Sequence, residues 1–234
     1  LKAPASCDYE AHYALAKRAA AEGAVLLKNE GGILPLQQGA KIAVIGTMAK
    51  RMRYQGAGSS HINPTGLSQP LDFLPDAIYA PGCDDRGDTT DALLDEARAA
   101  AEQAEVAVIF AGLPDRYESE GFDRNDMKMP AGHLRMIEAV VSANPNTVVV
   151  LLCGSAVECP WADEVKAVLY MGLPGQAGGE TIAELLYGRV NPSGKLAESW
   201  PFTYGDVPSS EIFGKTADAL YQEGIYVGYR YYDK

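Results

Sequence analysis

Two glutamates in a short charged segment, Glu118 and Glu120, are the residues of this sequence best suited to acid–base chemistry. They lie in residues 115–124 (DRYESEGFDR), where six of ten side chains are charged. A glutamic acid that donates a proton near neutral pH needs a raised pKa, from burial or from a neighbouring carboxylate. If the chain is extended, the two carboxyl groups share a face, and Arg116 or Arg124 could orient one of them. We therefore predict a catalytic acid in this segment, with a solvated charge cluster as the alternative interpretation.

The charged segment follows an apolar run, residues 106–112 (VAVIFAG), that is typical of a buried strand. In α/β proteins, ligand sites lie beyond the carboxyl ends of the strands. We therefore expect the segment to form a loop at that edge of a sheet. Such a loop supplies only half of the groups that a hydrolase needs.

The rest of the sequence alternates between helical and strand patterns. Apolar runs predict strands at residues 42–46, 77–80, 106–112, 147–154 and 165–172. Helical patterns predict helices at residues 9–28, which Asp8 could cap, and at 91–105, 133–143 and 178–187. Alternating tyrosines in residues 225–232 suggest one further strand.

This alternation of strands and helices is typical of right-handed βαβ units. We therefore predict one domain over residues 1–234, in the α/β class. Its expected architecture is a three-layer sandwich, in which helices flank a mostly parallel sheet of about five to six strands.

Charge and composition exclude several functional classes. A formal net charge of −11 and an isoelectric point near 4.7 argue against nucleic acid and against adhesion to anionic membranes as partners. No apolar run reaches the roughly 18 residues of a membrane span. The four cysteines form no CxxC pair, and Cys153 is expected to be a buried thiol. A cytoplasmic location is favoured, although the cysteines do not decide the compartment. Because the sequence starts at Leu1 without a signal segment, we expect it to be part of a longer polypeptide.

Motifs for cofactors, metals and serine nucleophiles are incomplete. Residues 56–58 (GAG) lack the third glycine and the immediately preceding strand of a dinucleotide fingerprint. Residues 188–195 have the wrong glycine spacing for a phosphate-binding loop. The three histidines form no ligand pair, and no GxSxG sequence is present. We expect no cofactor and no metal.

Several separated motifs together resemble one enzyme family. They are residues 20–30 (AAEGAVLLKNE) with 34–36 (LPL), 58–60 (GSS), 118–124 (ESEGFDR), 172–179 (GLPGQAGG), 191–196 (NPSGKL) and 223–230 (EGIYVGYR). In this order they are similar to the α/β sandwich domain of glycoside hydrolase family 3, the β-glucosidase family. The likeness runs over nearly the whole chain.

The resemblance implies a retaining glycosidase built from two domains. A barrel-type partner domain, absent from these residues, would carry the nucleophilic aspartate, and the sandwich domain would carry the acid/base glutamate. On this sequence the acid/base is expected to be Glu120, with Glu118 as the alternative. The expected substrates are terminal β-D-glucosides or related glycosides and oligosaccharides. A non-catalytic carbohydrate-binding or scaffold domain of the same fold remains the alternative function, and an unrelated flavodoxin-like nucleotide binder is a third.

The resemblance also suggests residues that contact the substrate. They are Arg53, Ser59, Ser60, His61, Tyr117 and Glu118. The simpler interpretation of residues 56–61 is that glycine and serine turn the chain there. The terminal tyrosines are expected to meet another domain, since the family often continues into a fibronectin-type module, here after residue 234.

Overall fold

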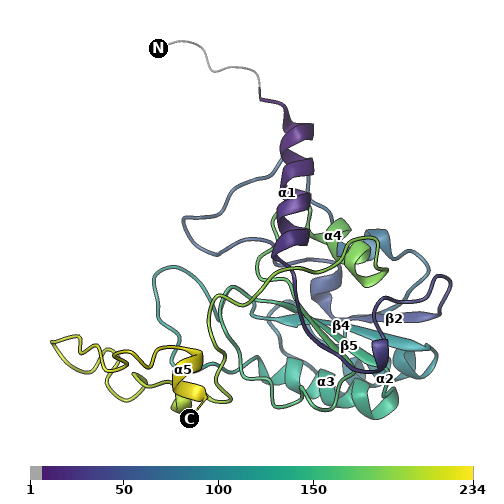
Figure 1. Ribbon diagram of the computed structural model, residues 1–234. Helices are drawn as coiled ribbons and strands as arrows, with labels where there is room; N and C mark the ends of the chain where they lie inside the picture. Colours follow the sequence, from purple (N-terminus) through teal and green to yellow (C-terminus); the bar gives the residue numbers. More distant parts are fainter. Residues whose placement is uncertain (1–6, 234) are drawn as a thin grey trace.

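The computed structural model describes residues 7–233 and forms a three-layer α/β sandwich around a six-stranded sheet (Figure 1). The strand order is β1-β6-β5-β4-β2-β3. Five strands are parallel: β2 (Ile42–Ile45), β3 (Ile78–Ala80), β4 (Val106–Gly112), β5 (Thr147–Leu152) and β6 (Ala167–Tyr170). At one edge, β1 (Val25–Asn29) pairs with β6 in the antiparallel direction. The predicted fold class is confirmed.

Helices cover both faces of the sheet. The helices α2 (Asp91–Glu102) and α3 (Ala131–Ala143) pack on one face, and α4 (Gly178–Leu186) packs on the other with α1 (Tyr9–Gly23) against it. Four short 3-10 helices lie in the connections, at Glu30–Gly32, Thr47–Ala49, Pro70–Phe73 and Tyr204–Asp206. None of the helices in residues 7–233 has both the length and the apolar character that a bilayer crossing requires.

The central strand β4 shows why the sheet is almost uniformly apolar. Successive side chains of a strand point to opposite faces. Ala107 and Ile109 join the core under α2 and α3, whereas Val108 and Phe110 join the core under α4. All four are fully buried, because helices cover both faces. The loops that follow β4 and its neighbours are thereby held at fixed positions.

The predicted helix over residues 9–28 is wrong at its C-terminal end. Asp8 caps α1 as expected, since its carboxylate accepts a hydrogen bond from the Ala11 amide at 3.0 Å. The helix ends at Gly23, however, and the next residues form β1. Gly23 disfavours continuation of the helix, and the apolar run of residues 25–27 favours a strand. Pairing with the edge of β6 stabilises this strand.

The predicted terminal strand over residues 225–232 is also wrong. These residues form a turn and the short helix α5 (Tyr229–Tyr232), away from the sheet (Figure 1). The edge of the sheet beside β6, which such a strand could have joined, is already occupied by β1. The other predicted elements are present, with ends shifted by a few residues.

The strand order contains one reversal point that positions the candidate site. From β2 the chain passes to β3 on one side, and it then returns to β4 on the other side of β2. The loops that leave the carboxyl ends of β2 and β4 therefore run in opposite directions. In open α/β sheets the crevice at such a reversal is the usual place for a ligand.

Candidate functional site

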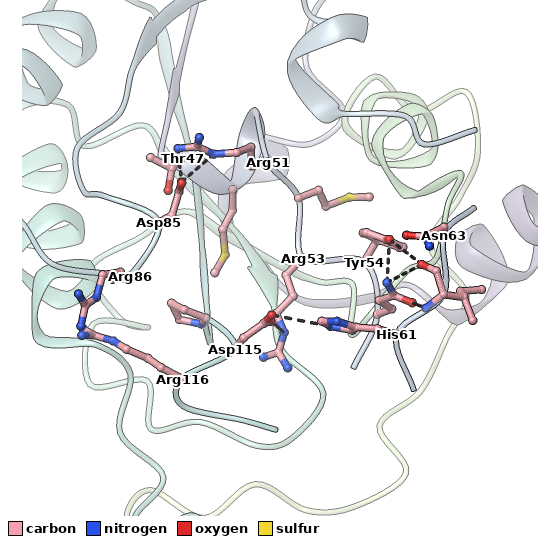
Figure 2. A pocket seen from close by; sticks show the side chains of 15 residues that line it. Thr47, Arg51, Arg53, Tyr54, His61, Asn63, Asp85, Arg86, Asp115 and Arg116 are labelled. Carbon is pink, nitrogen blue, oxygen red and sulfur yellow. Dashed lines mark hydrogen bonds and ion pairs between the residues drawn. The ribbon is translucent and has the colours of Figure 1, made fainter. Parts of the chain in front are cut away.

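A hollow of about 600 Å³ with a mixed polar and apolar lining lies beside this reversal point (Figure 2). The loop after β2 supplies most of its wall, and the start of the loop after β4 supplies part of the rest. The lining residues are Thr47, Met48, Arg51, Met52, Arg53, Tyr54, Gln55, His61, Ile62, Asn63, Asp85, Arg86, Pro114, Asp115 and Arg116. Arginine, amide and carboxylate groups and a tyrosine ring lie in this surface beside apolar side chains. Such groups can hold a ligand rich in hydroxyl groups through several hydrogen bonds.

Two of the predicted substrate-contacting residues, Arg53 and His61, line this hollow. His61 places Nε2 3.8 Å from a carboxylate oxygen of Asp115. The side chains of Tyr54 and Gln55 lie on the same side, where the Gln55 amide donates to the Tyr54 hydroxyl at 2.7 Å and to the Ile62 carbonyl at 3.0 Å. The sequence did not single out Tyr54, Gln55 or Asp115 as contact residues. The available signal was their position in the sequence: Tyr54 and Gln55 follow Arg53 directly, and Asp115 is the first residue of the charged segment.

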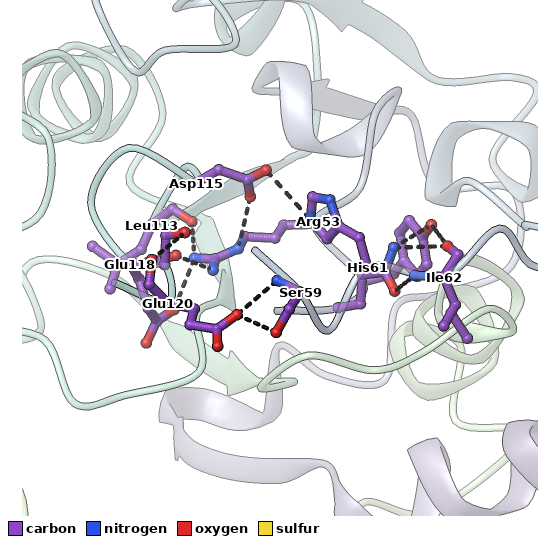
Figure 3. A network of polar contacts seen from close by, with 11 residues as sticks. Arg53, Ser59, His61, Ile62, Leu113, Asp115, Glu118 and Glu120 are labelled. Carbon is purple, nitrogen blue, oxygen red and sulfur yellow. Dashed lines mark hydrogen bonds and ion pairs between the residues drawn. The ribbon is translucent and has the colours of Figure 1, made fainter. Parts of the chain in front are cut away.

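Next to the hollow, the loops after β2 and β4 are joined through Glu120 (Figure 3). The Glu120 amide donates to the Ala57 carbonyl at 3.2 Å. One oxygen of its carboxylate accepts hydrogen bonds from the Ser59 amide, at 2.7 Å, and from the Ser59 hydroxyl. Two of the predicted site residues, Glu120 and Ser59, are therefore in direct contact. Ser60 is exposed, with its hydroxyl turned toward Gly56.

The Glu120 carboxylate has a lowered pKa, because the Ser59 hydroxyl and then the Ser59 amide donate hydrogen bonds to its charged form. The side chain is exposed, and no cation of residues 7–233 lies within ion-pair distance of it. The raised pKa that a proton donor requires is thus not produced by this chain alone. The carboxylate is free to contact further groups on its solvent side.

Glu118, two residues earlier, lies in a different environment. Its side chain is only 19% exposed. One carboxylate oxygen accepts from Arg53 Nη1 at 2.7 Å and from the Gly154 amide at 2.9 Å. The other accepts from the Ser155 hydroxyl at 2.5 Å. Because the segment forms turns, the two glutamates do not share a face, as an extended chain would have required.

Neither flanking arginine pairs directly with a glutamate, as the prediction had suggested, and Arg124 acts on Glu118 only through Ser155. Arg116 forms an ion pair with Asp88 at 2.7 Å and lies over the ring of Tyr117, 5.1 Å from its centre. Arg124 donates to the Ser155 hydroxyl at 2.8 Å and to a neighbouring carbonyl. The arginine that binds a glutamate is Arg53, which comes from a different loop. Tyr117 itself packs against the core under α3.

The loop after β5 also contributes, through residues that the sequence reading did not assign to the site. Gly154 and Ser155 follow directly on the apolar run that ends at Cys153. The rule that pointed to residues 115–124, polar groups after a buried strand, applies equally to them. Cys153 is buried as expected, and burial raises the pKa of its thiol. Within residues 7–233, no group of histidine, cysteine, aspartate or glutamate side chains is arranged to hold a metal ion.

Comparison with known proteins identifies relatives of this chain. The profile described as "Glycosyl hydrolase family 3 C-terminal domain" matches residues 24–229. Thermostable beta-glucosidase B of Acetivibrio thermocellus is 50% identical over 99% of this chain and 32% of its own length. An exo-alpha-(1->6)-L-arabinopyranosidase of Bifidobacterium breve is 45% identical over 97% of this chain and 32% of its own length.

A solved structure agrees with these sequence matches. The crystal structure of a GH3 beta-glucosidase from Bifidobacterium adolescentis superposes with a TM-score of 0.90 at 44% identity. The match covers 97% of this chain and 35% of that one. The chain thus spans about a third of the length of the relatives that it matches.

Proposed function

The chain belongs to glycosyl hydrolase family 3, as a C-terminal domain of that family, and on this premise we propose that it supplies the general acid/base, Glu120, of a retaining β-glycosidase. The nucleophilic aspartate would come from a barrel-type domain within the two thirds of the relatives that this chain does not span. The substrates would be terminal β-D-glucosides or related glycosides.

The observation that carries this proposal is the contrast between the two glutamates. All of the hydrogen bonds to Glu118 come from groups packed around it, and its side chain is largely buried. Glu120 is exposed, and it is fixed on one side only, by Ser59. A general acid must reach the glycosidic oxygen within hydrogen-bond distance. Of the two glutamates, Glu120 has the carboxylate that a substrate can reach.

The proposed reaction proceeds in two steps. Glu120 first donates its proton to the glycosidic oxygen while the aspartate forms a bond to the sugar and the leaving group departs. The Glu120 carboxylate then takes a proton from water as that water attacks the sugar carbon bonded to the aspartate. The bond to the aspartate breaks, and the sugar is released. In retaining enzymes the two carboxyl groups lie about 5–5.5 Å apart. The exposed side of Glu120 leaves room for a second carboxyl group at such a distance.

The pKa of Glu120 must rise when the enzyme is complete. In this chain Ser59 lowers that pKa, and solvent surrounds the outer side of the carboxylate. A covering domain would remove this solvent, and a nearby aspartate would add negative charge. Both changes disfavour the charged form of Glu120 and so raise its pKa. The proposal therefore assigns the raised pKa to the assembled enzyme.

The hollow lined by Arg53, Tyr54 and His61 would accommodate the leaving group. One of its lining residues, His61, is two residues along the chain from Ser59, which binds the Glu120 carboxylate. The choice of sugar would depend on the remaining domain. Two relatives with similar identity to this chain bear different names, a beta-glucosidase and an arabinopyranosidase, which supports a choice made outside it.

The direct test is Glu120→Gln in the full-length protein that carries this chain. We expect hydrolysis of an alkyl β-glucoside, whose leaving group needs protonation, to fall by about 100- to 10,000-fold. Hydrolysis of 2,4-dinitrophenyl β-glucoside should lose far less in its first step, because that leaving group needs no proton. Glu96→Gln, an exposed glutamate on α2, is the matched control.

The outcomes separate the proposed enzyme from a scaffold domain of the same fold. Equal losses on both substrates would argue against an acid role for Glu120. Unchanged hydrolysis in Glu120→Gln would show that another group is the acid. Sugar binding without hydrolysis by the unaltered full-length protein would favour the non-catalytic alternative.

A further inference from the structure

We infer that Glu118 and Arg53 form a buried clamp that positions the loop carrying Glu120, and that neither residue donates the proton in catalysis. This inference rests on the proposed role of Glu120. It gives Glu118 a positioning role in place of direct contact with the substrate, and it adds this role to Arg53, which also lines the hollow.

The clamp joins three loops that the strands deliver to the same edge of the sheet, and Figure 3 shows the contact between the first two, Arg53 with Glu118. Arg53 lies in the loop after β2, Glu118 in the loop after β4, and Gly154 and Ser155 in the loop after β5. The Glu118 carboxylate accepts from one group of the first loop and from two groups of the third. In this way a single side chain connects the acid-bearing loop to both of its neighbours.

Arg53 holds the same loop by its backbone. Its guanidinium donates to the Leu113 carbonyl and, at 2.7 Å, to the Glu118 carbonyl, in addition to the Glu118 carboxylate. The Arg53 side chain is only 5% exposed. The planar guanidinium presents several donors in fixed directions, so it can fix both the start of the loop and Glu118 at once. A lysine has a single charged nitrogen and cannot reproduce this set of contacts.

The backbone around the clamp is shaped to receive the carboxylate. A Cβ atom added at Gly154 would lie 3.2 Å and 3.3 Å from the two carboxylate oxygens of Glu118, and 3.1 Å from Leu173. Glycine at this position lets the Gly154 amide approach the carboxylate at 2.9 Å. The packed contacts around Glu118 leave no open side of its carboxylate comparable with that of Glu120. A substrate oxygen therefore has no direct access to it.

A positioning role predicts a particular effect on catalysis. Glu120 lies only two residues beyond Glu118, so release of the clamp displaces the acid relative to the substrate. A displacement of about 1 Å in a reacting group can lower a rate by about 100-fold. Protonation of a poor leaving group depends on this geometry, whereas departure of a good leaving group does not.

The experiment compares Glu118→Gln, Arg53→Lys and Ser155→Ala in the full-length protein, with Glu96→Gln on α2 and Arg18→Lys on α1 as exposed controls. For each variant, kcat and KM are measured against pH with an alkyl β-glucoside and with 2,4-dinitrophenyl β-glucoside. Circular dichroism establishes the temperature range in which the variant is folded, and kinetics are measured within that range. Ser155→Ala removes two hydrogen bonds, one to Glu118 and one from Arg124, and no charge, so it tests the clamp even if the other variants fold poorly.

We expect kcat/KM for the alkyl glucoside, which reports the first step, to fall about 100-fold in Glu118→Gln and Arg53→Lys and less in Ser155→Ala, with small changes in kcat/KM for the dinitrophenyl glucoside. The alkaline limb of the pH profile should remain, because Glu120 still titrates. Loss of that limb in Glu118→Gln would identify Glu118 as the acid and overturn the clamp. So would wild-type kinetics in all three variants, or equal losses on both substrates.

Failure of the clamp can be told apart from failure of the proposed function. If Glu120→Gln is inactive on the alkyl glucoside while the three clamp variants are unaffected, only the clamp is overturned. If Glu120→Gln is fully active, the role of Glu120 is overturned and the clamp, which depends on it, is overturned as well.

Discussion

Gly58 and Glu120 are packed so closely that no side chain fits between them. A Cβ atom added at Gly58 would lie 2.7 Å from the Glu120 Cβ and 3.0 Å from its Oε2. Gly58 also has a φ angle of +94°, which residues with a side chain rarely adopt. The absence of a side chain at this position therefore allows Ser59 to reach the Glu120 carboxylate.

Gly58→Ala should impair catalysis more than folding. The added methyl group would push Glu120 away from Ser59, and we expect activity on alkyl glucosides to fall by about 10- to 100-fold. Backbone strain should lower the free energy of unfolding by about 1–3 kcal/mol. Kinetics and denaturant unfolding of the full-length protein measure these effects. The control is Gly66→Ala in the same loop, where nothing lies within 4 Å of the added atom. Full activity in Gly58→Ala would contradict the close packing.

Ser59→Ala should move the pH dependence of catalysis in one direction. The Ser59 hydroxyl is the largest cause of the lowered pKa of Glu120, so its removal raises that pKa. The acid form of Glu120 then persists to higher pH, and the alkaline limb of kcat/KM should shift upward. Ser60→Ala serves as the control, because Ser60 does not contact Glu120. A shift to lower pH would be inconsistent with hydrogen bonding to the charged carboxylate.

His133 should make the fold sensitive to mild acid. Burial lowers its pKa from 6.5 to about 4, chiefly because the charged imidazolium would lose its hydration; its Nδ1 lies 3.0 Å from the Gly112 carbonyl oxygen. Between these two pH values the unfolded chain binds a proton at His133 that the folded chain does not. The free energy of unfolding should therefore fall as the pH drops from about 6.5 to about 4, by about 3 kcal/mol at most.

Urea unfolding at several pH values measures this dependence. His133→Gln should be less stable than the unaltered protein at pH 7, yet its stability should change less between pH 6.5 and 4. An unchanged slope in the variant would assign the acid sensitivity to other groups.

Phe110→Ala should show how strongly β4 supports the site. Phe110 is fully buried in the core under α4, so its truncation leaves a cavity and should cost about 3–5 kcal/mol. Phe202→Ala is the matched control, since Phe202 is 93% exposed and its loss should change stability by less than about 0.5 kcal/mol. Differential scanning calorimetry compares the two variants. Similar melting temperatures for both would rule out a core role for Phe110.

The sequence predicted the elements whose patterns are local. Apolar runs marked the five parallel strands, because both faces of each are covered and almost every position is apolar. The predicted helix over residues 9–28 failed after Gly23, since β1 depends on pairing with β6, more than 130 residues later in the chain. The alternating residues 225–232 failed for the opposite reason: a strand pattern forms a strand only where it pairs with another strand, and these residues pair with none of the six strands of the sheet.

For the site, the sequence by itself determined that a charged segment follows β4 and that Glu118 and Glu120 lie in it. Their separate environments were decided only by the tertiary structure. Arg53, Gly154 and Ser155 come from other loops, 65, 36 and 37 residues away from Glu118 in the chain. Spacing along a chain does not show which distant donors reach a carboxylate, because that depends on how parallel strands bring their loops to one edge of the sheet.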